Sequence, residues 1–201
     1  DPNGFLFTRG NDLFRQVNKA YRENYDLLMK SGLYDGLISE GLLVKHEESD
    51  QEPVAPKKAY KVIRPERVAF ISYPYEWCFS QYRDAALCTL QIVKLALEKN
   101  MILKDASAYN IQFQHGKPIL IDTLSFEKYQ EGMPWVAYRQ FCQHFLAPLA
   151  LMAFTDIRLN QLMRIYIDGI PLDLASPLLP GKTKLNLGVQ AHIHLHAYAQ
   201  K

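Results

Sequence analysis

The sequence is short of cysteine, of net charge and of long apolar runs, and each shortage excludes a class of protein. Three cysteines, an odd number without metal-site spacing, predict buried or free thiols in a reducing cytoplasm, not a disulfide framework. The 23 basic and 21 acidic residues give a net charge of +2, which provides no basis for binding nucleic acid or an anionic membrane. No apolar run approaches the roughly 18 residues of a membrane span, and no signal peptide is visible.

Apolar residues, in contrast, are plentiful. They make up 48% of the 201 residues, which is enough for a sizeable core in one domain or two small lobes. The chain begins at Asp1 and Pro2 without a methionine, which suggests a fragment or a processed chain.

The most informative stretch contains two predicted strands, residues 111–113 and 118–121. The turn between them contains Gly116, which is free to adopt a positive φ. A polar loop with Asp105 and Asn110 precedes the first strand. We therefore expect a β-hairpin that opens towards this loop.

Asp122 follows the second strand, so the hairpin should bring it close to Asn110 at the open end. Two oxygen ligands, with the Asp105 carboxylate one loop away, suit a hard cation such as Mg²⁺, which usually shares its coordination shell with a phosphate. A purely structural alternative remains open, because Asp and Asn also flank hairpins through their preference for turns.

The segment Lys104–Asn110, of sequence KDASAYN, resembles the catalytic loop of the protein-kinase-like superfamily. The resemblance implies that Asp105 is the catalytic residue and that Asn110 and Asp122 bind Mg²⁺ with ATP. Small-molecule kinases of the aminoglycoside and choline type are closer than protein kinases, because no Phe-Gly follows Asp122.

The whole chain also resembles the N-terminal region of bacterial nodulation-protein-related proteins that are described as class I SAM-dependent methyltransferases. This second resemblance runs through residues 4–7, 72–77, 122–127 and 135–141. It implies a kinase-like segment ahead of a methyltransferase domain that this chain lacks. Methyl transfer by the chain itself is not expected, because no strand is followed by a Gly-rich loop.

The resemblance predicts a two-lobed α+β protein-kinase-like fold. Residues 1–76 would form a reduced N-lobe with a small antiparallel sheet and helices, and residues 77–201 a mostly helical C-lobe that carries the loop and hairpin. The N-lobe departs from the kinase pattern, because neither a G-x-G-x-x-G loop nor a Val-Ala-Ile-Lys strand is present.

Four residues are candidates for nucleotide binding. Arg15 or Lys19 would reach a phosphate in place of the usual Lys, although an exposed basic residue on an edge strand is the plainer alternative. Tyr73 and Tyr75 lie in the segment that would join the lobes and meet an adenine ring, or would simply cover the core. Glu23 could pair with Arg15 or Lys19, or remain a solvated charge.

Periodicity predicts the remaining elements. In the most distinct helix, residues 81–99, the stripe Ala86, Leu90, Val93 and Leu97 should face the core. We expect strands over 4–9, 13–17, 60–63 and 68–73, helices from residue 20 and over 138–154 with a break at Pro148, 156–167 and 183–201, and a loop over 46–58.

The last of these helices carries His192, His194 and His196. His192 and His196 share one face of a helix and form a possible metal pair, or belong to a polar helix near a domain junction.

Two functions remain open on this evidence. The first is Mg²⁺- and ATP-dependent phosphoryl transfer to a small-molecule or sugar-type acceptor in the cytoplasm. The second is a non-catalytic kinase-like domain that binds a partner or serves as a scaffold for a C-terminal methyltransferase domain. Neither requires nucleic acid or a membrane.

Overall fold

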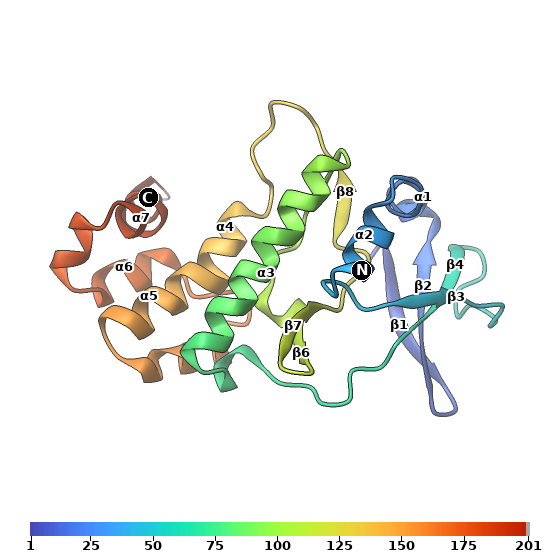
Figure 1. The fold of residues 1–201 in the computed structure, drawn as a ribbon, viewed down its shortest axis with the longest axis horizontal. Coiled ribbons are helices and arrows are strands. Elements are labelled where there is room, and N and C mark those ends of the chain that lie inside the picture. Colours follow the sequence, from blue (N-terminus) through green and yellow to red (C-terminus); the bar gives the residue numbers. More distant parts are fainter. Residues whose placement is uncertain (200–201) are drawn as a thin grey trace.

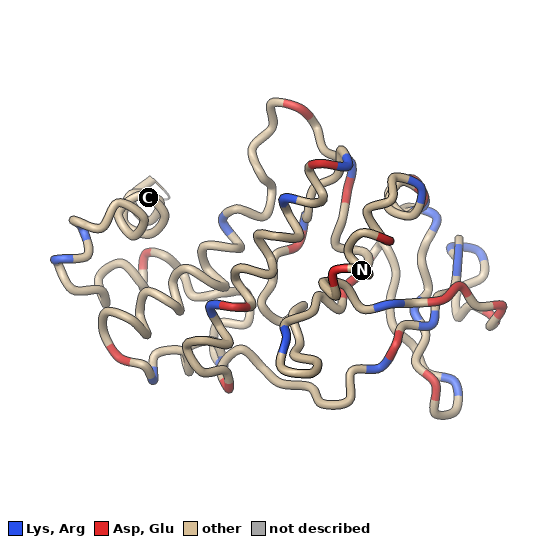
Figure 2. The backbone as a smooth tube through the Cα atoms, viewed as in Figure 1, with Lys and Arg blue, Asp and Glu red and all other residues tan. Residues whose placement is uncertain are grey.

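A computed structural model describes residues 1–199 of the chain. The molecule is mixed α+β and elongated, with a small sheet at one end, helices at the other and the long helix α3 between them (Figure 1). Acidic and basic residues are interspersed along the backbone (Figure 2). No helix within residues 1–199 combines the length and the apolar character needed to cross a membrane.

The sheet at the N-terminal end has four antiparallel strands in the order β1-β2-β4-β3. Their bounds are β1 Gly4–Arg9, β2 Asp12–Asn18, β3 His46–Glu48 and β4 Ala59–Pro65. Gly10, with a φ of 57°, forms the tight turn between β1 and β2. The predicted strands 4–9, 13–17 and 60–63 are therefore confirmed, with small shifts at their ends.

Two short helices follow β2, as the interrupted periodicity predicted. They are α1 Arg22–Lys30 and α2 Leu33–Ser39, and Gly32 separates them with a φ of 78°. Both helices contribute buried side chains to the larger core of the molecule.

Two of the predicted segments at this end differ from the structure. The expected loop 46–58 begins with the short strand β3. The expected strand 68–73 is irregular, and at Ser72 the Gln112 side chain pairs with the backbone. Gln112 Oε1 accepts a bond from Ser72 N at 2.9 Å, and Gln112 Nε2 donates to Ser72 O at 3.1 Å.

Helix α3 spans Phe79–Glu98, close to the predicted 81–99, but the predicted inward face is partly wrong. Leu90 and Leu97 are 42% and 41% exposed, whereas Ile92 is fully buried. The buried side chains lie on a neighbouring stripe, which comprises Tyr82, Ala85, Ala86, Cys88, Thr89, Ile92, Val93 and Ala96. Several residues on this stripe are small, which lets neighbouring elements pack closely against it. This packing, and not the hydrophobicity of the leucines, decided which face of α3 is buried.

The predicted hairpin is present, formed by β6 Ile111–Gln114 and β7 Lys117–Leu120. Its two-residue turn, His115 and Gly116, has positive φ at both positions, 52° and 77°, the geometry that favours glycine in tight hairpins. A second short antiparallel pair, β5 Met101–Leu103 with β8 Phe126–Lys128, flanks the hairpin.

The C-terminal end is helical but irregular. The predicted helix 138–154 is present but has no break at Pro148, because a π-helical turn at Cys142–Leu146 runs directly into α5 and leaves Pro148 in the first turn of α5, where the missing N–H is tolerated. The helices here are α4 Tyr138–Phe141, α5 Ala147–Phe154, α6 Leu172–Leu178, α7 Leu187–Val189 and α8 His196–Ala199, and a 3-10 helix spans Ile157–Arg164. Residues 200–201 of the expected helix 183–201 lie outside the described residues.

Two apolar clusters make up the core. The larger one joins α1 and α2 to α3, the hairpins and the C-terminal helices. The smaller one lies between the sheet and the hairpin region and comprises Val17, Tyr21, Tyr25, Ile63 and Leu124. Side chains from both sides of residue 76 contribute to the larger cluster. The division into two lobes at residue 76 therefore stays a prediction.

Candidate functional site

The hairpin holds Asn110 and Asp122 close together at its open end. Ile121 N donates a 2.8 Å bond to Asn110 O, so the residue before Asp122 is bonded directly to the loop that precedes the first strand. Lys104 N also donates to Ser125 O at 2.8 Å, which places the Asp105 loop beside the segment that follows Asp122. The three predicted oxygen-bearing residues therefore lie on adjacent backbone segments.

Asp122 forms an ion pair with Arg15 of strand β2. Arg15 Nη1 lies 2.6 Å from Asp122 Oδ1, and the two side chains are only 12% and 17% exposed. The same Oδ1 accepts a bond from Leu124 N at 2.9 Å, and Oδ2 accepts one from Ser125 Oγ at 2.7 Å. Arg15 and Lys19 were the two residues considered for contact with a phosphate, and Arg15 is the one that lies beside the hairpin.

The Arg15 guanidinium is only partly satisfied by this pair. Its Nε is buried and has no hydrogen-bond partner among the described residues. Buried polar atoms in native proteins nearly always find a partner, so an unpaired donor beside a carboxylate is an unusual feature. An anion bound at this position would satisfy it.

Asp105 is held in place by its own loop and by helix α4. Its Oδ1 accepts bonds from Ser107 N at 3.0 Å and from Gln140 Nε2 at 2.8 Å. Gln140 Oε1 in turn accepts a bond from Ala106 N at 2.7 Å. Oδ2 makes no hydrogen bond within residues 1–199, so one carboxylate oxygen of Asp105 remains able to accept a proton or a hydrogen bond.

Lys104 is a residue of this site that the sequence did not single out. Its ammonium lies 4.8 Å from the centre of the Tyr21 ring. Burial lowers the pKa of Lys104, and the nearby Glu127, Asp122 and Asp105 carboxylates oppose that shift. The only sequence signal was its position next to Asp105.

Tyr21 fixes the sheet against the hairpin region. Its hydroxyl donates to Phe126 O at 2.5 Å and accepts from Phe126 N at 3.2 Å. Burial raises the pKa of the Tyr21 phenol well above its usual range, so it stays protonated. Leu124 packs in the same cluster, close to Gly4, where a Cβ would lie 2.1 Å from Gln16 O. A larger residue at position 4 would separate these elements.

The other predicted nucleotide contacts are less well placed. Lys19 is exposed and its Nζ donates to Lys57 O at 3.0 Å, outside the Asp122 ion pair. Tyr73 and Tyr75 stack on each other, with ring centres 5.4 Å apart and planes inclined by 7°. The Tyr73 amide is already bonded to the Glu76 carboxylate at 2.8 Å.

The expected acidic and histidine partners lie elsewhere. Glu23 is exposed and makes no ion pair with Arg15 or Lys19 within residues 1–199. His192 and His196 do share a face, because His192 Nδ1 lies 2.5 Å from the Tyr138 hydroxyl and His196 stacks on the Tyr138 ring at 5.3 Å. Within residues 1–199 no three His, Cys, Asp or Glu side chains form a group that could hold a metal ion.

Comparison with known proteins gives one relative. The chain is similar to nodulation protein NoeA of Rhizobium meliloti (strain 1021), with 33% identity over 175 residues. The match includes 85% of this chain but only 36% of NoeA, so the chain spans about a third of the length of that protein. No family model matches the sequence. The similarity agrees with the resemblance to nodulation-related proteins noted from the sequence.

Proposed function

We propose that this chain is a divergent kinase-like domain that binds Mg²⁺ and ATP where Arg15 of strand β2 meets Asp122, which follows the β6–β7 hairpin. The observation that carries the proposal is Arg15, which pairs with Asp122 while its buried Nε lacks a partner. In protein kinases the phosphate-binding Lys lies on a sheet strand ahead of a helix, and the metal-binding Asp follows a pair of strands. Arg15 on β2, ahead of α1, and Asp122 after β7 occupy comparable positions in the chain.

The available side chains fit the proposed ligands. Asn110 and Asp122 supply the oxygen atoms that Mg²⁺ prefers, and within residues 1–199 Asp122 Oδ2 has a single donor, Ser125 Oγ. Arg15 would contact phosphate oxygens through its free Nε–H, as guanidinium groups commonly do. When bound, Mg²⁺ would neutralise charge on the nucleotide phosphates.

Asp105 would orient the acceptor. Gln140 and the Ser107 amide hold one carboxylate oxygen, so the other is directed by a fixed side chain towards an acceptor hydroxyl. Catalysis of phosphoryl transfer depends mainly on such positioning, with little covalent work for the protein. A small-molecule or sugar-type hydroxyl is the acceptor we propose.

The second candidate is a non-catalytic domain that serves a methyltransferase in a longer protein. Two observations favour it. The Ser72 and Tyr73 amides, in the segment expected to meet adenine, are already bonded to Gln112 and Glu76 side chains. In addition, Gly10 and Asn11 form a tight turn where kinases have a Gly-rich phosphate loop.

Thermal melts with ATP, with and without Mg²⁺, separate the two candidates. At about 100 times Kd, bound Mg²⁺ and ATP should raise the melting temperature by about 5–11 °C. Asp122→Asn keeps the shape but removes the charge, so it should abolish most of the Mg²⁺-dependent part of the shift. The exposed Asp35→Asn is the matched control and should keep the full shift, and each variant is compared with its own unliganded melt.

Three results would change this assignment. Unchanged melting temperatures with every nucleotide would favour the non-catalytic domain. A shift that survives Asp122→Asn would retain nucleotide binding but remove the metal assignment. A shift that survives Arg15→Ala would show that Arg15 does not replace the phosphate-binding Lys.

A further inference from the structure

A hollow lies on the opposite face of the β1–β2 ribbon from Arg15. In the antiparallel register Leu6 pairs with Arg15, whereas Phe5 pairs with Gln16, so Phe5 and Gln16 point away from the Asp122 site. A cavity of about 930 Å³ lies on the Phe5 side, between the N-terminal residues and loop 55–58. This volume lies within the range of small-molecule sites.

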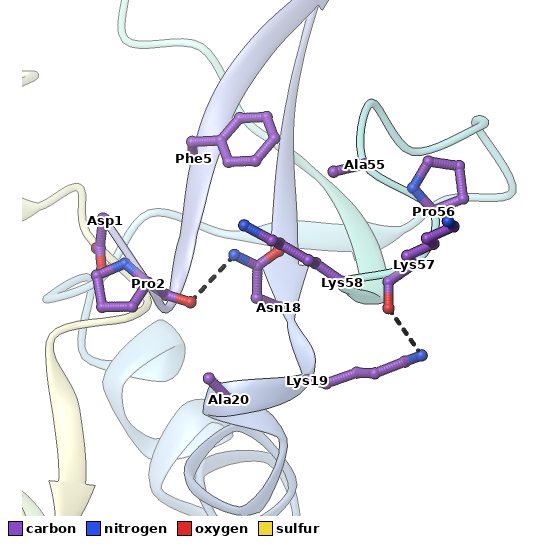
Figure 3. A pocket seen from close by; sticks show the side chains of 10 residues that line it. All are labelled: Asp1, Pro2, Phe5, Asn18, Lys19, Ala20, Ala55, Pro56, Lys57 and Lys58. Carbon is purple, nitrogen blue, oxygen red and sulfur yellow. Dashed lines mark hydrogen bonds between the residues drawn. The ribbon is translucent and has the colours of Figure 1, made fainter.

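The walls of this hollow combine basic side chains with an aromatic ring. Its lining comprises Asp1, Pro2, Phe5, Asn18, Lys19, Ala20, Ala55, Pro56, Lys57 and Lys58 (Figure 3). Three lysines and one aspartate give the lining a net charge of +2. None of the three lysines forms an ion pair with a carboxylate within residues 1–199.

The side chains of Lys58 and Lys19 extend in opposite directions across the hollow (Figure 3). Figure 3 shows the Lys58 side chain extending past Asn18 towards β1, below the Phe5 ring. The Lys19 side chain runs towards the loop and donates to Lys57 O at 3.0 Å (Figure 3). The Lys57 side chain turns instead towards Pro56 at the rim.

A buried amide network makes this hollow rigid. Gln16 is fully buried, and its Oε1 accepts a bond from Ala55 N at 2.9 Å. Its Nε2 donates to Asn18 Oδ1 at 2.7 Å, and Asn18 Nδ2 donates to Pro2 O at 3.0 Å. The backbone of Lys19 also donates to Lys58 O at 2.8 Å. The N-terminal segment and the loop that carries Lys58 are thus fixed to strand β2 before any ligand binds, which lowers the entropic cost of binding.

We propose that this hollow binds a small phosphate ester that carries an aromatic group. The phosphate would contact the Lys58 ammonium group, which has no carboxylate partner within residues 1–199. The aromatic group would pack against Phe5, whose ring borders the same hollow. This site is independent of the Asp122 site, since it lies on the other face of the ribbon.

Titration of ¹⁵N-labelled protein with phenyl phosphate at low ionic strength tests the proposal. Amide resonances of residues 5, 18–20 and 55–58 should shift together. Lys58→Ala should weaken binding by about tenfold, the usual scale for a charge-assisted bond. Phe5→Ala should remove the preference for phenyl phosphate over inorganic phosphate. Lys94→Ala, an exposed lysine on α3, should bind phenyl phosphate like the unmodified chain, and the amide resonances of residues 105, 110 and 122 should stay in place.

The proposal fails if phenyl phosphate shifts none of these resonances at millimolar concentration. It also fails if Lys58→Ala and Lys94→Ala weaken binding equally, because attraction would then come from overall charge. Shifts confined to the amide resonances of residues 105, 110 and 122 would move the phosphate to the Asp122 site and overturn the assignment. Equal affinity for phenyl phosphate and inorganic phosphate would refute the role of Phe5. None of these results depends on nucleotide binding at Asp122.

Discussion

The sheet end of the molecule is joined to the hairpins by a small apolar cluster together with partly or fully buried polar bonds, whereas the helical end is held mainly by apolar packing. Arg15 pairs with Asp122, and the Tyr21 hydroxyl makes two bonds with the Phe126 backbone. Around α3, by contrast, the contacts come from apolar side chains such as Ile92, Phe145 and Leu151. Polar bonds specify one arrangement of two elements, while apolar burial supplies most of the free energy of folding.

This comparison predicts that the largest loss of stability comes from the helical end. Ile92→Ala removes a fully buried side chain of α3 and should lower the free energy of unfolding by about 2–5 kcal/mol. Leu90→Ala, on the same helix but 42% exposed, should cost less than about 1 kcal/mol. Urea melts measure both values. Equal losses would show that α3 is rotated relative to the structure described here.

The Arg15–Asp122 pair should give the next largest effect. Each single alanine variant should lose about 2 kcal/mol, because it leaves a mostly buried charge without its partner. A double-mutant cycle should give a coupling energy of about 1–2 kcal/mol. The Arg64–Glu47 pair, 52% and 64% exposed, serves as the control and should couple by less than about 0.5 kcal/mol. Similar couplings for the two pairs would contradict a buried junction.

Two buried histidines should make stability depend on pH. Burial lowers the pKa of His46 and of His144 to about 4. Between this value and the ordinary pKa of about 6.5, the unfolded chain binds more protons than the folded chain, so stability falls as the pH falls through this window. Each histidine should contribute a slope of up to about 1.4 kcal/mol per pH unit.

His144→Gln tests this prediction near the candidate site, because His144 Nδ1 accepts a bond from Ala108 N at 3.2 Å. The variant should lose up to about 1.4 kcal/mol per pH unit of the slope between pH 4 and 6.5. Denaturant melts at a series of pH values give the slope, and the exposed His115 provides the matched control as His115→Gln. An unchanged slope in His144→Gln would assign the pH dependence to other groups.

The smallest effect is expected from a single hydroxyl at the sheet end. Tyr21→Phe leaves the Phe126 N–H and C=O without their partner and should cost about 1–2 kcal/mol. Tyr198→Phe, at a site that is 77% exposed, should change stability very little. If Tyr21→Phe also melts like the unmodified chain, the junction depends on Leu124 and its apolar neighbours instead.

Local patterns in the sequence were sufficient to predict several elements. The two short apolar segments on either side of Gly116 predicted the β6–β7 hairpin, since a two-residue turn with positive φ constrains both strands that it joins. The ends of α3 also followed from nearby residues. The proximity of Asn110 and Asp122 was predictable for the same reason, because one hairpin joins them.

The tertiary structure decided what depends on distant partners. The sequence could not choose between Arg15 and Lys19, because that choice depends on strand register and on the irregularity between Val17 and Asn18. Similarly, apolar residues occur on more than one stripe of α3, so only its packed neighbours determine that Ile92 faces inward and Leu90 outward.

The contacts that complete the candidate site are equally remote in sequence. Gln140 reaches Asp105 across 35 residues, and Tyr21 reaches Phe126 across 105. The amino-acid sequence alone determined the short-range geometry, because turns and helix ends are set by the backbone preferences of adjacent residues. Which side chains meet across the fold was decided only when elements far apart in the chain packed together and had to satisfy each other's buried polar groups.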